Sequence, residues 1–315
     1  MSENEMLQGW RGTVGIGIED TEGTAVDADL WFDVVEDHCR TDVEYYEHEG
    51  LGQVVDGSLS REEQSAPAIP VKLDNRVGGV VLPRFDHLLY LIPLALGDAL
   101  GGTEYTPGNT PKSFTVEANK AAEAETDAAC EQYAGGKLGT LTLESEAGGP
   151  LKATWEGVAR VRDWIAGTTV DYSAWATKPP MMHHGLTIQA GPDEVPTGAV
   201  YKLSIEIAAN LSEASFANSL TRIAAEPGRL VVTGTLTVPF NDTTAPIKTK
   251  IEAGTRFDLR PQYAGSDDET FDLYLSCKAQ GDPVQLNSAE GQQMEIRFRC
   301  YQTADTHAIR AVLGS

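Results

Sequence analysis

The chain has 315 residues and a formal net charge of −23, from 47 acidic and 24 basic residues. Binding to a nucleic-acid backbone requires clustered cations, so this balance argues against a DNA- or RNA-binding protein. The acidity has two explanations that stay open: adaptation to high salt, and a surface that repels DNA. At about 150 residues per domain, the length suggests two domains.

The first seventy residues give few regular signals. Met1 to Gly12 contains no apolar run, so no secretion leader is expected. Gly15 and Gly17 have the spacing of a dinucleotide loop, but no third glycine and no helix signal follow, which favours a turn or extended arm. Leu30 to Val35 is a predicted strand. Asp42 to Pro70 has no hydrophobic period, and a loop of this length is usually functional or disordered.

Two helices are predicted in the first half. Residues 85–100 are apolar on nearly all sides, so this helix must be buried, either in its own core or against another subunit. Its interface candidates are Phe85, Leu89, Ile92 and Leu96. The run is too short to span a bilayer, and no membrane association is expected. Asn119 to Tyr133 is Ala-rich and predicts a short second helix.

The strongest pattern is an alternation of apolar and polar residues, typical of antiparallel strands with one buried and one solvated face. It occurs at 201–207, 230–240, 271–277 and 294–300, with shorter versions at 247–251 and 257–259. In the first half, strands are predicted at 114–116, 141–143 and 151–161. The fold is therefore predicted to be mainly β, an antiparallel barrel or sandwich with a flanking helix.

Domain organisation is predicted from the segment Trp175 to Gly185, which contains Pro179 and Pro180. It separates a domain at 1–178 from a domain at 179–315. The two parts share a loose order of elements, and we therefore expect two tandem copies of one domain.

Chemistry-bearing motifs are few. His183 and His184 are the best metal candidates, but adjacent strand residues point to opposite faces, and solvated linker histidines are the preferred interpretation. Four cysteines form no CxxC pair and are expected to be reduced; Cys277 and Cys300 fall on inward strand faces, so a bridge between them is conceivable. No catalytic spacing is present, and we predict no enzyme, no cofactor and no metal.

Four segments carry a resemblance to a known family. They are SFTVEANKA (113–121), YAGGKLGTLTLESEAGGPLKATWEG (133–157), YKLSIEIAANL (201–211) and GRLVVTGTLTVPFND (228–242). In this order they resemble the tail tube proteins of long-tailed phages and related viruses. The resemblance runs from about residue 78 to the C-terminus, and residues 1–77 match less well.

The resemblance implies a β-barrel of the tail tube type in rings that stack into a hollow tube, through which DNA passes without specific binding. It implies a ring of identical chains, a trimer with pseudo-sixfold symmetry, in a virion tail made in the host cytoplasm. Tape measure, tail terminator and baseplate proteins are the implied partners. The 42–70 loop becomes the inter-ring contact, with candidates Tyr45, Tyr46 and Leu51. An acidic lumen is expected, with lumen-facing candidates Glu117, Glu144, Glu206 and Glu295.

Two other classes of protein compete with this interpretation. A surface carbohydrate-binding or adhesin-like β-sandwich predicts a monomer with an exposed aromatic platform. A β-rich hydrolase predicts a concave pocket with a perturbed carboxylate.

Overall fold

The computed structural model describes residues 13–32, 34–46, 54–55, 58–59, 69–119, 130–165, 178–190, 193–195, 200–212, 219–221, 225–239, 245–281, 284–288, 291–303 and 306–314. The elements of the first half are β1 (Thr13–Ile18), β2 (Leu30–Phe32), β3 (Val34–Asp37), β4 (Arg40–Tyr46), β5 (Val54–Val55), β6 (Ser58–Leu59), β7 (Ile69–Val81), α1 (Phe85–Leu96), β8 (Glu104–Tyr105), β9 (Phe114–Asn119), β10 (Cys130–Glu146), β11 (Lys152–Ala159) and β12 (Val161–Ile165).

The second half begins with a short 3-10 turn, η2 (His183–Gly185). Its further elements are β13 (Leu186–Ala190), β14 (Asp193–Val195), β15 (Lys202–Ala208), β16 (Val231–Pro239), α2 (Ala245–Glu252), β17 (Phe257–Ala264), β18 (Thr270–Ala279), β19 (Val284–Ser288), β20 (Gly291–Cys300) and β21 (Ile309–Gly314). The chain is mainly β, as predicted.

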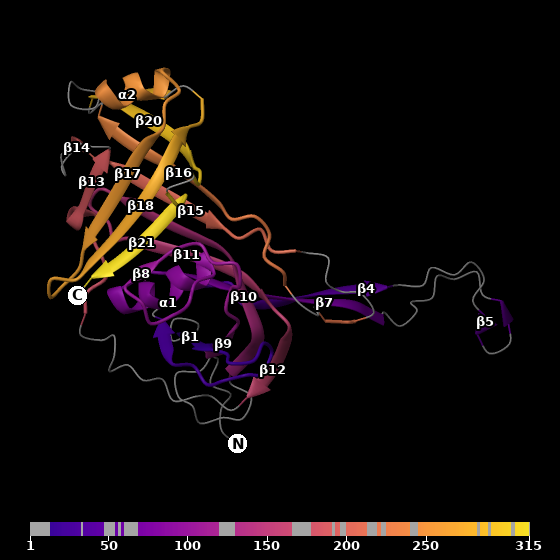
Figure 1. Cartoon of the computed structure of the whole chain (residues 1–315). Coiled ribbons are helices and arrows are strands. Elements are labelled where there is room, and N and C mark those ends of the chain that lie inside the picture. Colours follow the sequence, from indigo (N-terminus) through magenta and orange to yellow (C-terminus); the bar gives the residue numbers. More distant parts are fainter. Residues whose placement is uncertain are drawn as a thin grey trace.

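One continuous antiparallel sheet runs through both halves of the chain. Its strands follow the order β7, β11, β10, β15, β16 and β20, with β3 and β4 paired to β7 and β19 paired to β20. The halves meet where β10 pairs with β15, and Figure 1 shows the second-half strands lying above those of the first half. The sheet therefore crosses the predicted domain boundary, and the division at residue 178 stays a prediction.

The same strand pairings occur in each half. In the first half, β9 lies between β1 and β10, while β10 also pairs with β11 and β12, and β11 pairs with β7. In the second half, β17 lies between β13 and β18, while β18 also pairs with β20 and β21, and β20 pairs with β16. A helix follows β7 in one half and β16 in the other. These pairings support the prediction of tandem copies, which remains an inference.

The core-facing side chains of both halves form a single hydrophobic cluster. Trp155 is completely buried in it and contacts the rings of Phe32 and Phe114 at centroid distances of 6.3 Å each. The helix α1 packs into the same cluster, which is the first of the two alternatives predicted for it. Phe85, Ile92 and Leu96 are buried there, and Leu89 is partly buried against it.

Several local predictions differ from the structure. The helix at 85–100 is four residues too long, because Gly97 adopts a left-handed φ of 72° and its N–H group caps the helix on the carbonyl of Pro93. Residues 247–251 lie in the helix α2 and not in a strand. Asn119 ends β9 and Cys130–Tyr133 open β10, so both ends of the predicted second helix are strands, and residues 120–129 lie outside the described residues. The segment around Gly15 and Gly17, predicted to be a turn or an extended segment, is the strand β1.

His87 on α1 gives the fold an acid-sensitive position. Burial and the neighbouring Arg84 guanidinium lower the pKa of His87 to about 3, from an ordinary value near 6.5. As the pH falls below 6.5, the unfolded chain binds a proton that the folded chain does not, so folding stability decreases. The loss attributable to this group is about 2 kcal/mol at pH 5.

We expect His87→Leu to remove that part of the acid sensitivity. The test is to measure the free energy of unfolding by denaturant at pH 7 and at pH 5. The difference between the two values cancels any effect of the substitution on packing. The exposed His184, changed to Gln, is the matched control and should keep the wild-type pH dependence. Equal losses in wild type and His87→Leu would contradict the assignment.

Candidate assembly surfaces

The solvated side of the continuous sheet forms a broad polar surface, here called the polar face. Opposite residues of antiparallel strands share one side, so the registers define its rows. One row holds Glu144, Ser204, Thr235 and Arg297, and its neighbours hold Thr142, Glu206, Thr233 and Arg299, and Glu146, Lys202, Thr237 and Glu295. Three of the predicted lumen residues (Glu144, Glu206 and Glu295) therefore lie together on one surface.

The charges of the polar face nearly balance, because cations lie among the carboxylates. Lys202 pairs with Glu144, and Arg297 Nε lies 2.9 Å from Glu295 Oε1. The hydrogen bond that the Lys202 ammonium group donates to the Glu144 carboxylate raises the pKa of Lys202 above its ordinary value. Thr and Ser fill the central positions, so this surface is close to neutral although the whole chain carries −23. An acidic lumen stays a prediction.

Glu117 does not belong to the polar face. It lies on β9, between Gly15 of β1 and Gln132 of β10, and is completely buried. Gln132 Nε2 donates a hydrogen bond of 3.0 Å to Glu117 Oε1. In this chain the Glu117 side chain does not reach any surface, because both faces of β9 are covered.

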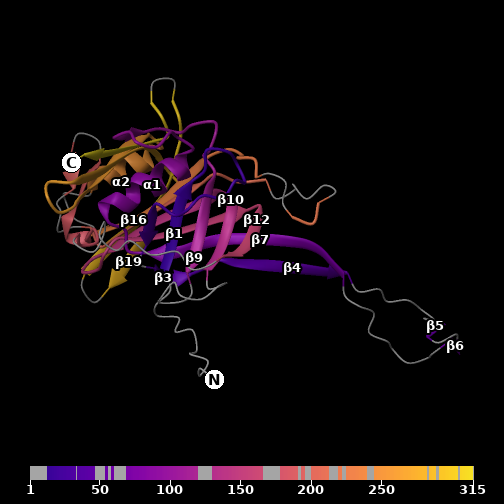
Figure 2. The same cartoon turned by 90° about the horizontal axis from the view of Figure 1, so that it is seen from below.

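A hairpin extends from the body of the molecule and is here called the arm. It consists of β4 paired to the first part of β7, from Arg40 opposite Arg76 to Tyr46 opposite Ile69 (Figures 1 and 2). The ends of the predicted 42–70 loop are thus regular strands, which the absence of a hydrophobic period did not reveal. Leu51 lies outside the described residues.

The arm carries exposed apolar side chains. Tyr45 is 55% exposed, and Val43 and Val71 are also exposed. On the adjacent β3, Val35 is 56% exposed at a bulge. These side chains include four of the seven large apolar residues that are exposed among the described residues. Val43, Tyr45 and Val71 lie near one another on the arm, whereas Val35 lies beside the other end of β7. Apolar exposure such as that on the arm indicates a surface for a protein partner. Sequence analysis identified only Tyr45 of this set.

A polar groove of about 580 Å³ lies at the base of the arm. Its walls come from the arm, from β11 and from the end of β15, and include His38, Arg40, Arg76, Glu156, Ala208 and Asn210. The His38 imidazole lies between two carboxylates, 3.5 Å from Glu36 and 3.8 Å from Glu156. The groove thus joins the arm to the polar face.

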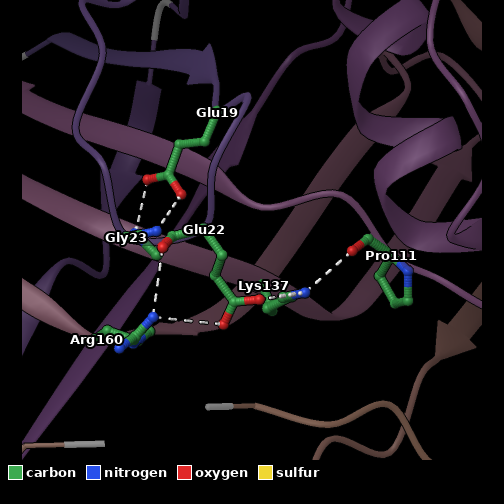
Figure 3. A network of polar contacts seen from close by, with 7 residues as sticks. Glu19, Glu22, Gly23, Pro111, Lys137 and Arg160 are labelled. Atoms are coloured by element: carbon green, nitrogen blue, oxygen red, sulfur yellow. Dashed lines mark hydrogen bonds and ion pairs between the residues drawn. The ribbon is translucent and has the colours of Figure 1, made fainter. Parts of the chain in front are cut away.

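A buried polar network holds the β1–β2 connection against β10 (Figure 3). Glu19 is 3% exposed and accepts hydrogen bonds from Gly23 N (2.8 Å), Gly135 N (2.7 Å) and Thr115 Oγ1 (2.9 Å). Gly135 has a φ of 68°, and a Cβ there would lie 2.8 Å from Arg160 Cδ, so this position requires glycine. Neither Glu19 nor Gly135 was a sequence candidate.

The outer part of the network is an ion pair. Lys137 Nζ lies 3.0 Å from Glu22 Oε2 and donates to the carbonyl of Pro111 at 3.1 Å (Figure 3). Arg160 Nη1 donates to the Glu22 carbonyl at 3.4 Å. The network fixes the loop after β1 to two other segments of the first half.

A second exposed region lies on β12, whose described pairing is to β10 on one edge. Trp164 is 51% exposed, and the Arg162 guanidinium lies 5.0 Å from the centre of its ring. Trp164 and Tyr45 are the exposed aromatic side chains among the described residues, and they lie on different sheets. They do not form the shared platform that a carbohydrate-binding module would present.

The candidate ligand residues have structural partners. His183 is buried, with Nδ1 3.1 Å from Ser145 Oγ and Nε2 2.8 Å from the carbonyl of Val200, so its prediction as a solvated residue is wrong. The neighbouring His184 is exposed. Cys277 and Cys300 are buried opposite each other with free thiols, their sulfur atoms 3.4 Å apart. Within the described ranges, no group of three or more His, Cys, Asp or Glu could hold a metal.

Among the helices that the structure describes, none is long and apolar enough to cross a membrane.

A protein-family model described as phage tail tube protein matches residues 9–300, nearly the whole chain. A search of curated proteins found no match.

Proposed function

The chain belongs to the phage tail tube protein family and is a structural protein of the virion tail, and from this premise we propose that it assembles into stacked rings that form the hollow tube. The observation that supports rings is the continuous sheet that joins both halves and ends in open strands. Open strand edges favour pairing with further strands, and pairing around a closed ring removes them.

The polar face is the surface we assign to the lumen. It is broad, rich in Thr and Ser, and two of its cations, Lys202 and Arg297, are paired with carboxylates. DNA binding through the backbone requires unpaired cations, so such a surface lets DNA pass without retaining it. Glu144, Glu206 and Glu295 are its acidic members.

The arm is the proposed contact between rings, with Tyr45 and Val43 as anchors on its exposed surface. Aromatic side chains with large exposed area commonly supply much of the binding energy of an interface. The ring itself is proposed to be a trimer with pseudo-sixfold symmetry, and tape measure, terminator and baseplate proteins are its proposed partners in the tail.

Negative-stain electron microscopy of the purified chain at several salt concentrations tests the proposal. We expect hollow tubes or stacked rings, more abundant at higher salt, because salt screens the repulsion between chains of charge −23. Particles that stay monomeric at every salt and protein concentration would overturn it.

A further inference from the structure

The pairing of β10 with β15 is a junction between the two halves. The first part of β10, up to Gly136, pairs with β9, and its later part, Thr140–Glu146, pairs along the same edge with β15. The opposite edge of β10 pairs with β12 along its first part and with β11 along its later part. The junction therefore places a strand of the second half beside the end of a long strand of the first.

The second half contains an equivalent of the later part of β10. The end of β18 and the whole of β19 both pair with β20. In the first half, the later part of the single strand β10 pairs with β11 in the same way. β19 is therefore the counterpart of Thr140–Glu146. Among the described pairings, β19 pairs with β20 along one edge and with no strand along its other edge. The corresponding edge of β10 is the one that pairs with β15.

The first half contains an equivalent of β15. β15 pairs with β16, which precedes α2, and β3 pairs with β7, which precedes α1. Of the pairings that the structure describes for β3, all are to β7. Its other edge is the counterpart of the edge through which β15 meets β10.

We propose that β19 of one chain pairs antiparallel with β3 of the next copy of the chain, and that this junction repeats β10–β15 between molecules. The inference rests on the proposed ring assembly and names the strands that close it. Val35, exposed at the bulge of β3, lies at this edge and would be covered by the neighbouring chain. Each chain offers a different strand at each end, so the contact is head-to-tail, the type of contact from which closed rings are built.

Two glycines align the halves residue by residue. A Cβ at Gly79 would lie 2.9 Å from the carbonyl oxygen of Glu36 and 3.7 Å from the Trp155 ring. A Cβ at Gly234 would lie 2.5 Å from the carbonyl oxygen of Ser204 and 2.4 Å from the Phe298 ring. Each glycine thus has, as neighbours, one carbonyl of the strand on one side and one aromatic ring of the strand on the other. Glu36 therefore corresponds to Ser204, and Trp155 corresponds to Phe298.

The alignment fixes the register of the proposed junction. Within the chain, Ser204 lies opposite Glu144, and Glu144 also lies opposite Lys152 of β11. Lys152 precedes Trp155 by three positions and so corresponds to Glu295, which lies opposite Val284. Val284 is therefore the counterpart of Glu144, and we expect it opposite Glu36 of the neighbouring chain.

A cysteine cross-link tests this register. Opposite residues of antiparallel strands lie at a separation that a disulfide can span. We expect Glu36→Cys with Val284→Cys, under mild oxidation of the assembled protein, to give covalent oligomers on non-reducing gels. Each single variant should give none, which also controls for the four native cysteines.

The chain offers a matched control at its internal junction. Glu144→Cys with Ser204→Cys should form a disulfide within one chain, detected by peptide mass mapping, and no oligomers. A register control, Arg40→Cys with Val284→Cys, should give no cross-link, because Arg40 lies four positions beyond Glu36.

The outcomes separate the two proposals. Rings or tubes in the microscope, together with a closed internal control and no intermolecular cross-link, would overturn the β3–β19 junction and leave the proposed function standing. A wild-type chain that forms no assembly would overturn both. Cross-linking by the Arg40 pair in place of the Glu36 pair would overturn the register.

Discussion

Replacing residues 47–68 with an Asn-Gly turn is expected to abolish tubes while the fold stays intact. Tyr46 lies opposite Ile69 at the end of the arm, so a two-residue turn can close the hairpin directly. The variant removes the distal part of the proposed inter-ring contact, including Leu51, and keeps every residue of the hydrophobic core. Electron microscopy and size-exclusion chromatography should show single rings or smaller species.

Thermal unfolding is the control for folding in this variant, and its midpoint should match that of the unassembled wild-type chain. In a second variant, residues 47–68 are replaced by a Gly/Ser sequence of equal length. This variant keeps the length of the segment and removes its side chains, so it distinguishes an effect of length from an effect of side-chain contacts. Both variants should fail to stack if the side chains make the contact. Tubes of normal length from the shortened variant would show that residues 47–68 do not join the rings.

Glu19→Ala is expected to destabilise the fold by about 4 kcal/mol. Its carboxylate is buried and accepts three hydrogen bonds, two of them from backbone N–H groups. Without it those donors lose their acceptor inside the protein, which costs about 1–3 kcal/mol for each buried group. Chemical denaturation of the unassembled chain measures the change in free energy of unfolding.

Glu22→Ala is the matched control for Glu19→Ala. Glu22 lies three residues further along the same loop, and its side chain is 32% exposed. Its ion pair with Lys137 is partly solvated, and Lys137 keeps its hydrogen bond to the carbonyl of Pro111. We therefore expect the free energy of unfolding to fall by only about 1 kcal/mol. Equal effects from the two substitutions would contradict the role given to the buried carboxylate.

The strands with one buried and one solvated face could be predicted from sequence. β15, β16 and β20 show the alternation because their inner residues lie in the core and their outer residues face solvent; β18 alternates in sequence as well, although its polar Asp272 and Ser276 are buried. The same physics placed Glu144, Glu206 and Glu295 on one side of the sheet. β9 breaks the rule, since both of its faces are covered and Glu117 is buried with a hydrogen bond from Gln132.

The arm and α2 could not be predicted in the same way. The arm has no core beneath it, so no buried face imposes a period on its sequence. In α2, Ile247 and Ile251 fit a helical spacing of four as well as a strand spacing of two. Lys248 and Glu252, 3.5 Å apart, satisfy the helical spacing. The Glu19 network was missed because its partners are backbone groups distant in sequence.

The internal junction also has a kinetic meaning. In the proposed three-chain ring, every second junction is a β10–β15 pair that forms when a chain folds, without any encounter between molecules. Starting a ring then depends on the meeting of three molecules, where separate half-chains would require six. The rate of nucleation consequently falls less steeply with dilution, and tubes can begin to grow while the concentration of newly made subunits is still low.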